Sequence, residues 1–202
     1  MIDLVYRILG PVRGVLKRWA PTRLKQIVWH AEFKRGKHLH DIPNHGKSEV
    51  CYYIEKYAEG GDVLDLGCAD GHVGFGLDPE KCRSYTGVDI SEVGVKQAKC
   101  QRDSTSNPLP QMEFVVGDIS KYIPSKPVDV ILFKDSLYYI PKRKIIPVLH
   151  NLRKYLKSNG VFIVQMDNIK RHNWIRNLIL ANFDCLEDRV YRDRDFMRLI
   201  FR

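Results

Sequence analysis

Short apolar runs alternate with helical patterns along most of the chain. Short runs of mostly apolar residues predict strands at residues 63–66, 85–89, 112–116, 128–133 and 161–165. Apolar residues at three-and-four spacing predict helices at residues 48–57, 91–101, 141–156 and 169–180. Strands that alternate with helices indicate an α/β fold, with a mostly parallel sheet covered by helices on both faces.

The last two predicted strands pair differently. Residues 183–191 and 196–201 are separated only by a short charged turn. A parallel connection needs about a dozen residues, so these two strands are expected to form an antiparallel hairpin. The sequence thus predicts a parallel sheet that ends in a C-terminal antiparallel hairpin.

The first 47 residues follow another pattern. Apolar residues from Ile2 to Trp19 have helical spacing, but Pro11 interrupts them, which predicts two short helices. Residues 24–33 predict a further helix. We therefore divide the chain into a basic helical extension or lid at residues 1–47 and a main domain at residues 48–202. Burial of its aromatic residues over a pocket is the favoured role of the extension, and contact with a membrane surface is the alternative.

Composition narrows the class of protein. The 202 residues, 44% hydrophobic and 28% charged, suit one globular domain with an appendage. No apolar run reaches about 18 residues, and basic residues interrupt every apolar run near the start, so neither a membrane span nor a secretory leader is expected. Five cysteines without a Cys-x-x-Cys pair predict no zinc site and indicate the cytoplasm.

The formal charge of +9 is concentrated near the start of the chain. Residues 1–50 contain ten Lys or Arg and four acidic residues. Such a surface could attract nucleic acid, anionic lipid or an anionic small molecule, and charge alone does not choose among them.

A glycine-rich turn follows the first predicted strand. Residues 63–74 read Val-Leu-Asp-Leu-Gly-Cys-Ala-Asp-Gly-His-Val-Gly, so Asp65 lies near the strand end and small residues follow it. Small residues let a ligand approach the backbone. The spacing differs from the dinucleotide fingerprint, because Ala69 holds the position of its middle glycine. Asp65 would repel a pyrophosphate but attract an amino group, which favours a nucleoside that carries an amino acid.

Two further aspartates end the next two strands. Asp89 could accept hydrogen bonds from both hydroxyls of a ribose, and Asp118 could accept one from an adenine amino group. A single strand-end aspartate is as easily explained as a turn former. Aspartates at the ends of three successive strands favour a nucleoside-binding site.

These residues resemble a known family, the class I S-adenosylmethionine-dependent methyltransferases. Residues 65–71 are similar to its glycine-rich first motif, and the resemblance extends over about residues 48–202. It implies a Rossmann-like sheet with the C-terminal hairpin, S-adenosylmethionine as cofactor, S-adenosylhomocysteine as product, and no metal. It also implies that Asp65 helps to hold the methionine amino group, directly or through water. The other cofactor-binding residues that it implies are Gly67, Cys68, Ala69, Asp70, Gly71, Asp89, Ile90, Asp118, Ile119 and Lys134.

The acceptor is expected after the fourth predicted strand. Residues 133–139 resemble the Phe-Asn-Glu-x-Leu-Tyr-Tyr stretch of small-molecule methyltransferases, with Lys134 and Asp135 in place of Asn and Glu. Asp135, Tyr138 and Tyr139 are therefore candidates for positioning or deprotonating an acceptor. His45 precedes the main domain and is a candidate base that closes over the site.

The sequence therefore predicts a methyltransferase that acts on an oxygen, less favourably a nitrogen, of a small metabolite, sugar or natural-product intermediate, with an anionic acceptor among the options. An RNA methyltransferase is one alternative, although the Asn-Pro-Pro-Tyr motif and a recognisable RNA-binding module are missing. The other alternative is a non-catalytic subunit that binds the cofactor. Nothing in the sequence indicates the oligomeric state.

Overall fold

A computed structural model describes residues 13–34, 48–105 and 109–202. Within these residues, seven strands form one sheet in the order β3-β2-β1-β4-β5-β7-β6. The first five strands are parallel, whereas β7 is antiparallel to both β5 and β6. Their bounds are β1 Asp62–Leu66, β2 Ser84–Asp89, β3 Gln111–Val116, β4 Val128–Lys134, β5 Leu156–Asp167, β6 Cys185–Tyr191 and β7 Phe196–Phe201. The expected Rossmann-like sheet with its C-terminal hairpin is confirmed.

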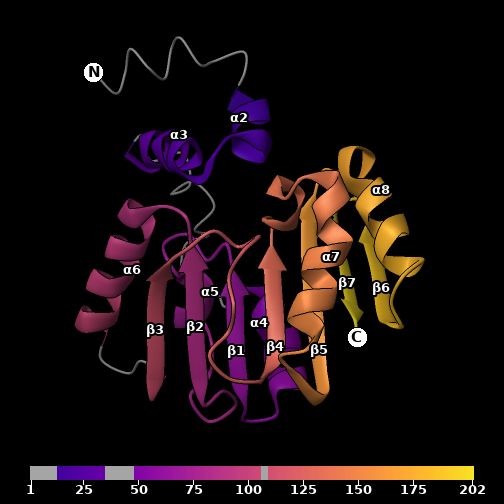
Figure 1. Cartoon of the computed structure of the whole chain (residues 1–202). Helices are drawn as coiled ribbons and strands as arrows, with labels where there is room; N and C mark the ends of the chain where they lie inside the picture. Colours follow the sequence, from indigo (N-terminus) through magenta and orange to yellow (C-terminus); the bar gives the residue numbers. More distant parts are fainter. Residues whose placement is uncertain (1–12, 35–47, 106–108) are drawn as a thin grey trace.

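Helices cover both faces of the sheet (Figure 1). Helices α4 (Glu49–Ala58), α5 (His72–Phe75) and α6 (Glu92–Ser104) pack on one face, around a core that includes Ile54 and Tyr85. Helices α7 (Lys142–Arg153) and α8 (Ile169–Leu180) pack on the other, around a core that includes Leu149 and Phe162. Alternate residues of each central strand enter opposite cores, because side chains alternate across a strand. None of the described helices is long and apolar enough to cross a bilayer.

The predicted start of the fifth strand is wrong by five residues. We expected a strand to begin at Val161, but β5 begins at Leu156. Val128 of β4 pairs with Leu156, while Val130 pairs with Val161, so a register shift accommodates residues 157–160. A β-bulge of this kind places extra residues in one strand, and it is not visible in the hydrophobic pattern. The predicted helix at 141–156 accordingly ends at Arg153.

Two N-terminal helices lie over the carboxyl ends of the parallel strands (Figure 1). They are α2 (Arg13–Trp19) and α3 (Thr22–Lys34), which agree with the predicted helices on this side of Pro11. The helix predicted before Pro11 lies outside the described residues. The Oγ1 of Thr22 donates to Asp118 Oδ2 at 3.1 Å, which ties α3 to the residue that follows β3 and Gly117.

Candidate active site

A cavity of about 550 Å³ opens at the carboxyl ends of the parallel strands, beneath α2 and α3. Its wall includes thirteen of the predicted site residues, which are Asp65, Gly67, Cys68, Ala69, Asp70, Asp89, Ile90, Asp118, Ile119, Lys134, Asp135, Tyr138 and Tyr139. Gly71 is not among its lining residues, and His45 lies outside the described residues. The cavity lies where open α/β sheets bind their ligands.

Asp65 is the most deeply buried carboxylate of this cavity, with 1% of its surface exposed. Its Oδ2 accepts a hydrogen bond from the Tyr85 hydroxyl at 2.6 Å, and its Oδ1 has no partner among the described residues. Burial raises the pKa of Asp65 to about 6, against the lowering effect of the Tyr85 hydrogen bond. A buried oxygen without a partner is costly, so a cationic donor bound here would stabilise it.

The glycine-rich turn brings the backbone close to the cavity. Gly67 has φ +100°, and a Cβ there would lie 2.4 Å from Ser136 Cβ, so only glycine fits. Ala69 adopts the left-handed region at φ 55°, where the related motif has glycine. Gly71, also left-handed at φ 81°, approaches Phe114 behind the turn, which explains why it is not part of the cavity wall.

Asp89 and Asp118 are both held by local backbone N–H groups. Asp89 Oδ2 accepts from Ala69 N at 3.0 Å and its Oδ1 accepts from Ser91 N at 2.8 Å. Asp118 Oδ1 accepts from the N and Oγ of Ser120, and despite burial these bonds keep the pKa of Asp118 below its ordinary value. Asp118 Oδ2 also accepts from Thr22 Oγ1. Both carboxylates shape their turns and line the cavity, where a carboxylate oxygen can accept from more than one donor.

Cys68 and Asp70 complete this end of the cavity. Burial raises the pKa of the Cys68 thiol well above its ordinary value, and nearby Asp89 raises it further, so the thiol stays protonated and is no nucleophile. Burial would also raise the pKa of Asp70, but hydrogen bonds and charge from His72 bring it below its ordinary value. His72 Nδ1 lies 3.2 Å from Asp70 Oδ1.

Lys134 and Asp135 lie at the end of β4. Asp135 has a left-handed backbone at φ 53°, a conformation that is uncommon for residues other than glycine but is found more often for Asn and Asp. Its N donates to Gln165 O and its Oδ1 accepts from Asp167 N, both at 2.9 Å, which joins the ends of β4 and β5. Its Oδ2 lies 3.7 Å from Lys134 Nζ. These contacts make Asp135 a link between the ends of β4 and β5 on the cavity wall.

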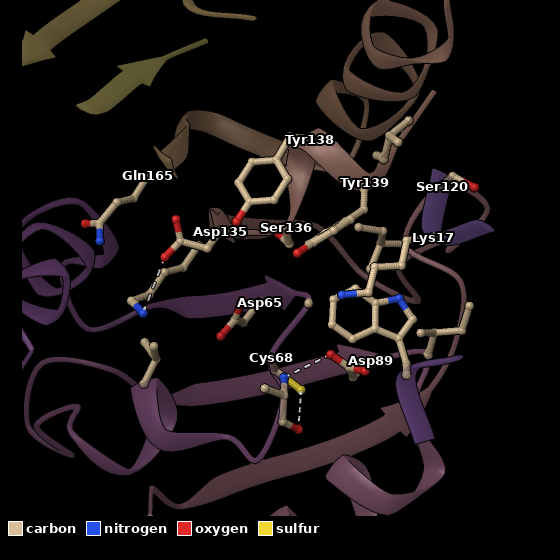
Figure 2. A pocket seen from close by; sticks show the side chains of 18 of the residues that line it. Lys17, Asp65, Cys68, Asp89, Ser120, Asp135, Ser136, Tyr138, Tyr139 and Gln165 are labelled. Carbon is tan, nitrogen blue, oxygen red and sulfur yellow. Dashed lines mark hydrogen bonds and ion pairs between the residues drawn. The ribbon is translucent and has the colours of Figure 1, made fainter. Parts of the chain in front are cut away.

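Tyr138 and Tyr139 lie in a short 3₁₀ turn, Leu137–Tyr139, that borders the cavity (Figure 2). Burial is the main cause that raises the pKa of Tyr138 far above its ordinary value and that of Tyr139 to about 12. Tyr138 stacks on His172, with ring centroids 4.1 Å apart and an angle of 4° between the rings. Both phenols keep their protons near neutral pH, as a phenol with an ordinary pKa of about 10 also does.

Several cavity residues were not among the predicted site residues. Lys17, Lys25 and Trp29 come from α2 and α3, and Gln165 comes from β5. Trp29 packs edge-on against Tyr139 with centroids 4.7 Å apart, and Lys17 Nζ lies 4.0 Å from the centre of the Trp29 ring. Aromatic residues near the start of the chain were the only sequence signal for this contribution. Nothing local to residue 165 indicates its place.

The residues fit S-adenosylmethionine. The unpartnered Asp65 Oδ1 suits its ammonium group, and the acceptors of Asp89 and Asp118 suit ribose and adenine. Among the described residues, no group of three His, Cys, Asp or Glu side chains could hold a metal ion.

Comparisons with known proteins agree with this geometry. A family model described as "Methyltransferase domain" matches residues 58–190. Among curated proteins, a trans-aconitate 2-methyltransferase from an Enterobacter species is 34% identical over 54% of this chain and 40% of its own length. A malonyl-[acyl-carrier protein] O-methyltransferase from Ilyobacter polytropus is 27% identical over 65% of this chain and 50% of its own length. The chain thus spans half or less of the length of these two relatives.

Solved structures share the fold at low sequence identity. A methyltransferase from Clostridium acetobutylicum has a TM-score of 0.68 at 15% identity, covering 84% of this chain and 98% of that one. Magnesium protoporphyrin IX methyltransferase from Synechocystis, solved with S-adenosylhomocysteine bound, has a TM-score of 0.66 at 15% identity and covers 89% of this chain and 97% of that one. With the family match, the strand order and the site geometry, the chain belongs to the class I S-adenosylmethionine-dependent methyltransferases.

Proposed function

We propose that this protein transfers a methyl group from S-adenosylmethionine to a carboxylate oxygen of a small organic acid. The observation that carries the proposal is the protonation state of Tyr138 and Tyr139. They follow β4 and border the cavity, and we call this part of the cavity the acceptor end. Both phenols keep their protons at neutral pH, because the ordinary pKa of a phenol is about 10 and burial raises both values further. Such groups orient an acceptor but do not deprotonate it. A carboxylate suits them, because it is already ionised at neutral pH and needs no general base.

Residues at the other end would hold the cofactor. Asp65 would accept from its ammonium group, Lys134 would pair with its carboxylate, and Asp89 would accept from the ribose hydroxyls. Ile90 and Ile119 would contact the adenine, and Asp118 would accept from its amino group. The cofactor supplies an activated methyl group on a sulfonium. These residues then contribute mainly position and orientation, which can be worth about 7–11 kcal/mol of a barrier in favourable cases.

The names of two relatives support the acceptor class. One is a trans-aconitate methyltransferase and the other methylates an oxygen of a malonyl group on a carrier protein. Two carboxylates also border the acceptor end here. Asp135 accepts a hydrogen bond from Asp167 N and lies near Lys134, and both contacts offset its negative charge. The side chain of Asp167 is 64% exposed, so solvent screens its repulsion of a bound anion.

We also propose that residues 48–202 form the catalytic domain and that residues 1–47 form a lid over it. The support comes from the described part of the extension. Lys17, Lys25 and Trp29 line the cavity, and Thr22 bonds to Asp118. A lid of this kind would exclude water from the acceptor and the cofactor.

The test uses S-adenosylmethionine with a labelled methyl group and a panel of organic acids that includes trans-aconitate and malonate. A methyl ester releases its label as volatile methanol in mild alkali, whereas a methylated amine or alcohol does not. We expect a labelled product whose label is released by alkali, and no labelled product in a reaction without an organic acid. Label that survives alkali, or that enters RNA in a parallel reaction, would contradict the proposal.

A further inference from the structure

A buried arginine lies directly behind the acceptor end of the cavity. Arg198 of β7 is 1% exposed, although it carries a full charge. Its Nη1 lies 3.2 Å from Glu49 Oε1, and its guanidinium lies 4.2 Å from the centre of the Tyr53 ring. Burying such a charge is expensive unless its donors are satisfied. The partners of Arg198 must therefore satisfy its donors, and one of these partners also lines the cavity.

That partner is Gln165 of β5. Gln165 Oε1 accepts two hydrogen bonds from Arg198, at 3.2 Å from Nε and 2.8 Å from Nη2. Gln165 also lines the cavity, at its far end from Lys17 (Figure 2). Since the planar guanidinium only donates, the amide oxygen must face Arg198. The amide Nε2 then faces away from it, and no described residue accepts a hydrogen bond from this nitrogen.

The sheet register brings these residues together. Lys134 of β4 pairs with Gln165 of β5, and Gln165 pairs with Arg198 of β7. Residues paired across neighbouring strands share a face of the sheet. This face is the one that α4 covers, and the first residue of α4, Glu49, completes the row. A chain of hydrogen bonds thus runs from Glu49 through Arg198 to Gln165.

We propose that Gln165 binds the methyl acceptor through Nε2, and that Arg198 is the positioning residue that fixes its amide. The cation behind the amide oxygen polarises the amide and strengthens the donor on the cavity side. Such a donor suits an anionic oxygen, so Gln165 selects an acceptor with a carboxylate. This inference rests on the proposed function and names the residue that recognises its substrate class.

A purely structural Gln165 would respond differently to one substitution. Gln165→Glu keeps the size of the side chain and places a carboxylate against Arg198, which favours folding. The same change removes the donor and places a negative charge beside the acceptor. We therefore expect Gln165→Glu to fold with unchanged affinity for S-adenosylhomocysteine, while KM for the acids of the panel rises at least about tenfold.

Two more variants complete the test. Gln111→Glu is the matched control. Gln111 is exposed at the amino end of β3, whereas the cavity lies at the carboxyl ends of the strands, so the KM of this variant should not change. Arg198→Lys keeps the charge but loses the planar fork, so KM should rise while kcat stays within about twofold. If Gln165→Glu fails to fold, Gln165→Met, which has a similar size and no donor, replaces it.

The outcomes separate this inference from the proposed function. Acids that are methylated by the wild type and by Gln165→Glu with equal KM would overturn the inference and leave the proposed function intact. Loss of S-adenosylhomocysteine affinity in Gln165→Glu would make Gln165 a cofactor residue and would also overturn it. A wild type that methylates no acid would overturn both.

Discussion

Burial in the fold changes the charge state of Asp65. With its pKa raised to about 6, the folded protein binds a proton there more tightly than the unfolded chain does. Its protonation therefore stabilises the fold fully below the ordinary value of about 3.8, and this contribution is lost as the pH rises through about 6. Binding of an ammonium group needs the opposite, charged state.

We predict that affinity for S-adenosylhomocysteine falls as the pH is lowered from 7 to 5, by about tenfold at the lower end. Calorimetric titration across this range measures it. His72 and Lys134 also act on Asp65, so His72→Gln is the control and should keep the pH dependence. Asp65→Asn should bind weakly at every pH. A wild-type affinity that does not change with pH would rule out Asp65 as the ammonium partner.

Asp89 has a structural and a proposed ligand role, and two variants separate them. Asp89→Ala removes the acceptor for ribose, so affinity for S-adenosylhomocysteine should fall more than tenfold. Ser91→Ala is the matched control, because Ser91 Oγ caps α6 by accepting from Gly94 N at 3.3 Å. It should cost about 1 kcal/mol of stability and spare affinity. A folded Asp89→Ala that binds within about threefold of wild type would refute the ribose assignment.

A substitution of Tyr138 tests the acceptor end of the cavity. Because Tyr138 lines the cavity and its phenol is protonated at neutral pH, we treat it as a donor that orients the acceptor. Tyr138→Phe should lower turnover about tenfold while affinity for S-adenosylhomocysteine stays unchanged. Steady-state rates and calorimetry measure the two effects. Unchanged turnover would place the acceptor elsewhere in the cavity.

At the scale of elements, several side chains of α3 contact the main domain, and His30 Nε2 for example lies 3.9 Å from Glu92 Oε2 of α6. Trp29 packs edge-on against Tyr139, and Thr22 bonds to Asp118. We predict that Trp29→Ala lowers protection from amide hydrogen exchange in residues 22–34 while the strands of the sheet keep theirs. Ile27→Ala is the control, since Ile27 is 49% exposed. Loss of protection throughout the sheet would show that α3 belongs to the core rather than to a lid.

The elements were largely predictable because their signals are local. The helix at Ile169–Leu180 matches its predicted bounds, and the strand-end aspartates lie together as parallel strands require. The start of β5 was not predictable, because the bulge opposite Asp129 depends on pairing between strands. For the same reason Gln165 and Arg198 gave no signal, since they meet only through sheet register.

At the scale of the whole molecule, the net charge of +9 differs in sign from the charge of the side chains that line the cavity. Six aspartates and three lysines line it, namely Asp65, Asp70, Asp89, Asp118, Asp135, Asp167, Lys17, Lys25 and Lys134. The excess of basic residues therefore lies elsewhere on the chain. The charge of an acceptor has to be argued from a local donor such as Gln165. An acidic cavity also suits a cofactor that carries a sulfonium and an ammonium group.

The same acidic cavity predicts which nucleotides stabilise the whole protein. A ligand that binds only the folded state at about 100 times its Kd adds about 2.7 kcal/mol. For a chain of this size, S-adenosylhomocysteine should then raise Tm by roughly 5–10 °C. A nicotinamide dinucleotide would place its pyrophosphate near Asp65 and Asp89, so it should leave Tm unchanged. Thermal unfolding with each ligand measures this, and Asp89→Ala should lose most of the S-adenosylhomocysteine shift. A dinucleotide shift as large as that of S-adenosylhomocysteine would contradict the assignment of these carboxylates.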